Sequence, residues 1–89
     1  TKVLFANLGE QEQEASMRII SKLRDKGVAA EIYPDMGKMK KQMEYANRRG
    51  IPYVVIIGSN ELERSVATLK NMQSSEQQEV TFDELVATL

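Results

Sequence analysis

The stretch that decides the fold is Gly50-Ile51-Pro52-Tyr53-Val54-Val55-Ile56-Ile57-Gly58-Ser59-Asn60-Glu61. Its middle is a short apolar run without alternation, bounded by a glycine on each side, which is typical of a strand buried on both faces. Such a strand needs helices on both faces of its sheet, and amphipathic segments precede and follow it in the chain. The polar residues Ser59, Asn60 and Glu61 follow the carboxyl end of this strand, where open α/β sheets bind their ligands.

The composition excludes several kinds of site and partner. The chain has 89 residues and a formal net charge of -1, and it contains neither cysteine nor histidine. These absences rule out a disulfide framework and a thiolate zinc site, and they remove the commonest general base. Because the net charge is close to zero, a site for a polyanion must be a local patch of the surface. No apolar run is long enough for a membrane span, so we expect no membrane partner.

The predicted elements follow from hydrophobic period and from glycine and proline breakers. We expect strands at 3–6, 28–32, 52–57, 66–70 and 77–80, and helices at about 10–26, 38–49 and from 81 onwards. The last helix opens with Thr81-Phe82-Asp83-Glu84, which has the form of a capping box. Because crossovers are right-handed, the simplest sheet places the first strand between the second and the third. The loop Asn7-Leu8-Gly9 and the turn at Ser59, Asn60 and Glu61 then line one crevice.

The helix expected at 38–49 is basic along one side. The residues that share this side are Lys38, Lys41, Tyr45 and Arg48 or Arg49, with Lys40 nearby. One interpretation is a solvated face opposite a stripe of methionines, and Met36, Met39, Met43 and Met72 are then core filler. The other is contact with phosphate groups, because lysine and arginine supply the sequence-independent part of nucleic-acid binding.

No combination of residues suggests catalysis. The chain has no glycine-rich phosphate loop and no serine with a plausible base partner. The carboxylates of Glu10, Glu12 and Glu14 lie close together, but acids at the start of a helix are ordinary partners of the helix dipole. We therefore predict no catalytic residue, no metal ligand and no cofactor of the chain's own.

Two segments carry a resemblance to a known family, Lys38-Met39-Lys40-Lys41-Gln42-Met43 and Ile51 to Glu61. With them, the chain resembles the C-terminal anticodon-binding domain of class II aminoacyl-tRNA synthetases, which charge histidine, threonine, proline and glycine. The Lys-Lys-Gln triplet, the strand ending Ile-Gly-x-x-Glu, and the basic Lys70 nine positions after Glu61 look most like the histidyl enzyme. The resemblance covers essentially all 89 residues.

The resemblance implies a fold and a ligand. The fold is a three-layer α/β/α domain with five strands in order 2-1-3-4-5 and strand 4 antiparallel, taken from the C-terminus of a longer chain. The ligand is the anticodon loop of a tRNA, with Glu61 matching a base-reading acid and Lys70 a basic residue on the neighbouring strand. Further RNA contacts are expected from Lys38, Lys40, Lys41, Gln42, Asn7 and Asn60. The histidine anticodon contains guanines, whose edge offers two N–H donors to a carboxylate such as that of Glu61.

The rest of such a parent enzyme is also implied by the resemblance. It would be a cytoplasmic homodimer that uses ATP and magnesium to charge tRNA with histidine in a separate catalytic domain. Two alternatives stay open at this stage: a domain of the threonyl, prolyl or glycyl enzyme, and a synthetase-like domain that binds proteins in a regulator. One departure from a simple RNA-binding surface is Glu63, which follows Glu61 and would repel phosphate if it faced the RNA.

Overall fold

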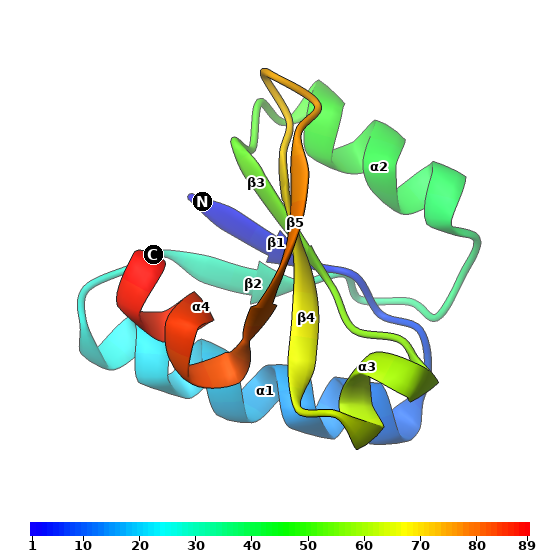
Figure 1. Ribbon diagram of the computed structural model, residues 1–89. Coiled ribbons are helices and arrows are strands. Elements are labelled where there is room, and N and C mark those ends of the chain that lie inside the picture. Colours follow the sequence, from blue (N-terminus) through cyan, green and yellow to red (C-terminus); the bar gives the residue numbers. More distant parts are fainter.

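The computed structural model describes residues 1–89 as one sheet with helices on both faces (Figure 1). The elements in chain order are β1 (Val3–Phe5), α1 (Glu10–Asp25), β2 (Ala30–Ile32), α2 (Met39–Arg48), β3 (Tyr53–Ile56), α3 (Ser59–Glu63), β4 (Val66–Asn71), β5 (Gln77–Thr81) and α4 (Phe82–Thr88). Every predicted strand and helix is present. The segment after β3 was predicted to be a polar turn and is instead the short helix α3. It winds into a helix because Leu62 packs against the core beneath it.

The sheet has the strand order β2-β1-β3-β4-β5, as predicted. β1 pairs in parallel with β2 and with β3, so that Val3 lies opposite both Ala30 and Tyr53. β4 runs antiparallel to β3 and to β5, which makes the second half of the sheet a hairpin added to a parallel core. Gly27 and Gly50 end α1 and α2 with φ values of 84° and 67°, a left-handed conformation that favours glycine.

A large hydrophobic cluster fills the space between the sheet and the helices α1 and α4. α1 contributes the predicted stripe of Ile19, Ile20 and Leu23, which are all buried. The full cluster consists of Val3, Phe5, Ile19, Ile20, Leu23, Ala30, Val55, Ile57, Ala67, Leu69, Val80, Leu85 and Leu89. α4 closes this face, and its capping box is formed as predicted: the Thr81 side chain accepts from the Glu84 N–H at 3.1 Å, and the Thr81 N–H donates to Glu84 Oε1 at 3.0 Å.

The opposite face of the sheet is covered by α2 alone and has a much smaller core (Figure 1). Its buried residues are Leu4, Ala46, Ile51 and Val54. Met43 and Met72 are partly buried against this cluster, in agreement with their predicted role as filler. Met36 was predicted to do the same and does not: its side chain is 54% exposed, because it lies in the loop before α2.

Candidate nucleic-acid interface

A groove of about 500 Å³ lies between α2 and the end of the β4–β5 hairpin. Seven residues line it: Lys40, Met43, Glu44, Asn47, Lys70, Met72 and Ser75. Lys40 comes from α2 and Lys70 from β4, so two cations predicted as separate RNA contacts face the same groove. Its apolar floor is formed by the two methionines.

The sheet register explains why Lys70 faces this groove. Lys70 pairs with Val54 of β3 and with Gln77 of β5. Residues paired across a sheet point to the same face, and Val54 belongs to the small cluster under α2. Lys70 therefore lies on the α2 face, beyond the part of the sheet that α2 covers.

Three groove residues were not predicted from the sequence, namely Glu44, Asn47 and Ser75. Glu44 and Asn47 follow Lys40 by four and seven residues, which places all three on one side of α2. This spacing was a signal available in the sequence. Ser75 lies in the turn between β4 and β5, has φ of 62°, and reaches the groove only because the hairpin folds toward α2.

Two residues predicted to contact RNA are buried instead. Gln42 is 1% exposed and Asn7 is 2% exposed. The carboxamide of Gln42 accepts from the Asn7 N–H at 2.7 Å, and it donates to the Asn7 carbonyl at 3.0 Å and to the Gly37 carbonyl at 3.1 Å. The Asn7 amide donates to the Tyr33 carbonyl at 3.1 Å. Both side chains are enclosed within the protein, where Asn7 Oδ1 has no partner, so neither presents a polar edge to a ligand at the surface.

The other cations near the start of α2 are exposed. Lys38 is the N-cap of the helix, and Lys41 lies next to Lys40 on its outer surface. At the far end, Arg49 donates to the Tyr45 hydroxyl at 2.8 Å and lies 5.4 Å from the centroid of that ring. The predicted basic side of α2 is therefore free at its beginning and engaged with an aromatic ring at its end.

Glu61 lies at the carboxyl edge of the sheet, in the first turn of α3. Its carboxylate folds back over Gly58, as the geometry shows: a Cβ atom added to this glycine would lie 3.3 and 3.4 Å from the two carboxylate oxygens of Glu61. Glu12 lies in the same way over Gly9 at the start of α1. The Ser59 hydroxyl donates to Glu12 Oε1 at 3.3 Å, which joins the start of α3 to the first turn of α1, directly after the loop at Asn7-Leu8-Gly9. This edge offers hydrogen-bond acceptors and negative charge. The predicted contact Asn60 is exposed there.

Glu61, matched to a base-reading acid of the family, and Lys70, matched to a basic residue on the neighbouring strand, lie at different ends of β3. Lys70 is opposite Val54, near the start of the strand, whereas Glu61 follows the strand's end. From Val54 to Gly58 an extended chain rises about 13 Å. A ligand that contacts both side chains must therefore extend along the sheet.

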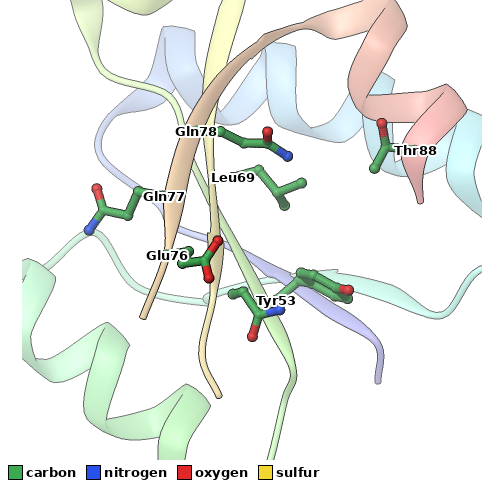
Figure 2. Close-up of a pocket in the computed structure, with 7 residues that line it drawn as sticks. Tyr53, Leu69, Glu76, Gln77, Gln78 and Thr88 are labelled. Carbon is green, nitrogen blue, oxygen red and sulfur yellow. The ribbon is translucent and has the colours of Figure 1, made fainter. Parts of the chain in front are cut away.

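A second hollow, of about 310 Å³, lies on the opposite face (Figure 2). Its lining consists of Tyr53, Leu69, Asn71, Glu76, Gln77, Gln78 and Thr88. It contains no lysine or arginine and none of the predicted site residues. A hollow without a cation lacks the ordinary ligands of phosphate, so it is a poorer candidate for a polyanion than the groove beside α2.

Two further features of the molecule bear on its class. Aspartate and glutamate are the only residues of metal-binding type in this chain, and no three of them lie together in a way that could hold a metal ion. None of the helices has the length and apolar character needed to cross a bilayer.

Comparison with known proteins places the chain in a family. Residues 2–89 match the model of a family described as "Anticodon binding domain". The chain is 55% identical over 89 residues to a histidine–tRNA ligase of Bacteroides fragilis and 52% identical to that of Phocaeicola vulgatus. It spans 20% of the length of each of these relatives.

Solved structures agree. A histidyl-tRNA synthetase from Nostoc sp. superposes with a TM-score of 0.93 at 27% identity, over 99% of this chain and 21% of that one. The RNA-binding domain of a threonyl-tRNA synthetase from Cryptosporidium parvum shares the fold, with a TM-score of 0.87 at 18% identity over 98% of this chain and 22% of that one. The predicted resemblance to the histidyl type is thus confirmed, and the alternatives are not favoured. The chain belongs to the family of anticodon-binding domains, in the form found in histidine–tRNA ligases.

Proposed function

We propose that this domain binds the anticodon loop of a histidine-accepting tRNA through the α2 face and the carboxyl edge of the sheet. The observation that carries the proposal is the groove shared by Lys40 and Lys70, which joins two cations from distant parts of the sequence. Exposed Lys38 and Lys41 extend the positive surface along the start of α2. Although the whole chain has a net charge of -1, this one region is suited to a polyanion.

In this proposal, the α2 face binds phosphate groups and the carboxyl edge of the sheet reads a base. Lysine ammonium groups bind phosphate and fix the position of the RNA without reading its sequence. A carboxylate at Glu61 can accept two N–H donors from the edge of an unstacked guanine, and a uracil cannot offer that pair. Lys70 lies near the start of β3, and Glu61 follows the end of that strand. The anticodon loop would therefore be spread along the sheet, with phosphates at one end and a base at the other.

The parent protein is proposed from the relatives. These are histidine–tRNA ligases of which this chain spans about a fifth. We propose that the chain acts within such an enzyme, whose catalytic domain would use ATP and magnesium to join histidine to tRNA. A homodimeric, cytoplasmic enzyme belongs to the same proposal.

The experiment measures tRNA affinity over a range of salt concentrations for Lys40→Ala and Lys70→Ala. Each should weaken binding and lower the salt slope by about one unit or less, because each removes one phosphate contact. Lys22→Ala, an exposed lysine of α1 on the other face, is the matched control and should change neither quantity. Equal effects of all three variants would show that the groove has no special role.

The identity of the tRNA needs a separate measurement. Affinity for the histidine tRNA should exceed that for the same tRNA with its anticodon guanines replaced, and both should decline with salt. Equal affinity for the two would leave a general RNA-binding domain and remove the proposed specificity.

A further inference from the structure

The buried carboxamide of Gln42 continues the backbone pairing of the sheet. After β1, the Ala6 N–H still bonds to the Val55 carbonyl at 2.9 Å, and the chain then leaves the sheet. Asn7 is buried at this point, and its N–H and carbonyl both pair with Gln42 instead of with a strand. A buried backbone group without a partner is strongly unfavourable, so the Gln42 side chain satisfies two groups that the sheet leaves unpaired.

The apolar contacts of α2 are few, and the largest is that of the partly buried Tyr45, whose ring meets the ring of Tyr33 edge-on with 5.3 Å between centroids. Ala46 is the only fully buried apolar residue of the helix, and its methyl group is small. Met43 is partly buried, and its flexible side chain adapts to more than one arrangement. By contrast, the three hydrogen bonds of Gln42 are directional and connect α2 to β1's exit and to Gly37. The two bonds to Asn7 hold α2 against the sheet in both rotation and axial position, while the bond to Gly37 is local to the loop before the helix.

We infer that Gln42 is a positioning residue of the RNA interface, acting through the lysines beside it in the sequence. The inference rests on the proposed function. Lys40 and Lys41 immediately precede Gln42, and successive helical residues are separated by about 100°. A slip or rotation of α2 by one residue would therefore turn Lys40 out of the groove that it shares with Lys70. Gln42 holds the lysines in place without touching RNA.

Two substitutions test the inference. Gln42→Met keeps a similar length and removes all three hydrogen bonds without adding charge. Gln42→Glu keeps an acceptor for the Asn7 N–H, but at pH 8 its carboxylate has no donor for the two carbonyls. Burial and the facing carbonyls favour the protonated form of this new group, so the lost donor returns as the pH falls. Gln11→Glu, at an exposed position of α1, is the control that adds the same charge.

The first readout is hydrogen exchange of the Asn7 backbone amide, followed by NMR. Gln42→Met should accelerate this exchange, because the Asn7 N–H loses its acceptor. Gln42→Glu should lower the melting temperature at pH 8 and recover part of the loss at pH 5.5, and Gln11→Glu should show no such recovery. An unchanged Asn7 exchange rate in Gln42→Met would overturn the positioning role.

The second readout is a double-mutant cycle in tRNA affinity. Gln42→Met should weaken binding about tenfold when Lys40 and Lys41 are present, and less than about threefold when both are replaced by alanine. Equal losses in the two backgrounds would mean that Gln42 acts independently of these lysines, and would reject the inference. If the unmodified protein does not bind tRNA, the proposed function fails, while the exchange rate of Asn7 still decides whether Gln42 holds α2.

Discussion

The two faces of the sheet are built differently. The face under α1 and α4 holds a cluster of 13 buried apolar residues, and the face under α2 holds a cluster of 4. The first face contains the polar hollow without cations, and the second contains the groove with Lys40 and Lys70. One face thus provides most of the hydrophobic stabilisation, and the other carries the groups suited to RNA.

The difference has a physical reason. Apolar burial stabilises a fold in proportion to the area removed from water, and it works best where two helices cover the sheet. A binding face must leave part of the sheet open, so it cannot be covered in the same way. On the α2 face the small core is supplemented by the three directional hydrogen bonds of Gln42. These hydrogen bonds are formed beneath α2, so they occupy none of its exposed surface and leave the neighbouring lysines free to contact a ligand.

The largest expected effect tests whether the face under α1 and α4 contributes more to stability than the face under α2. Leu23→Ala, at a fully buried position under α1, should lower the free energy of unfolding by about 2–5 kcal/mol. Met43→Ala, at a partly buried position under α2, should cost about 1–2 kcal/mol, because less area is buried there. Urea unfolding of the two variants measures both values. A larger loss for Met43→Ala would break the comparison.

The next effect concerns recognition at the edge between the faces. Glu61→Gln keeps the shape of the side chain and replaces one acceptor by a donor. We expect a loss of about 1–3 kcal/mol in discrimination between the histidine tRNA and an anticodon variant, by analogy with bidentate base contacts. In the parent enzyme, charging of tRNA should slow while activation of the amino acid is unchanged.

The alternative for Glu61 is a purely structural role in the turn, because its carboxylate lies over Gly58 at the start of α3. In that case the melting temperature falls and the ratio of cognate to variant tRNA binding stays the same. Measuring both quantities on one variant separates the two roles.

The sequence predicted the fold well because its signals are local and repeated. The run at Tyr53–Ile56, the stripe of Ile19, Ile20 and Leu23, and the capping box at Thr81 each indicate one element and one buried side. The placement of β1 between β2 and β3 followed from crossover handedness, and the full strand order was implied by the family resemblance.

The site was predicted less completely, and Gln42 shows why. A glutamine next to two lysines suggests a solvated surface, and the Lys-Lys-Gln triplet was interpreted as RNA contact. The helical period gave the opposite signal, since Gln42 precedes buried Ala46 by four residues and lies on the buried stripe. The groove itself was beyond sequence reasoning, because it depends on how the hairpin with Lys70 and Ser75 packs beside α2.

A smaller effect is expected at the capping box on the well-packed face. Thr81→Ala removes the side-chain acceptor of the Glu84 N–H and should cost about 1 kcal/mol of stability. Because α4 lies on the face opposite the groove, tRNA affinity of the folded protein should not change. Thermal unfolding and a binding titration on the same variant check both statements. Weaker RNA binding without loss of stability would mean that α4 takes part in recognition.

The smallest effect is a change in the pH dependence of stability through Glu84. Hydrogen bonds from the Thr81 backbone N–H and, second, the Thr81 side chain hold the pKa of the Glu84 carboxyl below its ordinary value of 4.5. A carboxyl whose pKa is lower in the folded state contributes stability above pH 4.5, and this contribution is lost as the pH falls through the folded-state value.

Glu84→Gln keeps an acceptor for the Thr81 N–H but does not titrate. Its stability should therefore decline less between pH 6 and pH 3 than that of the unmodified protein. Urea unfolding at the two pH values measures this difference, and equal declines would show that the box contributes hydrogen bonds without a charge effect. Either way the groove beside α2 should bind tRNA at pH 6 as before, because Glu84 belongs to the face that supports the fold.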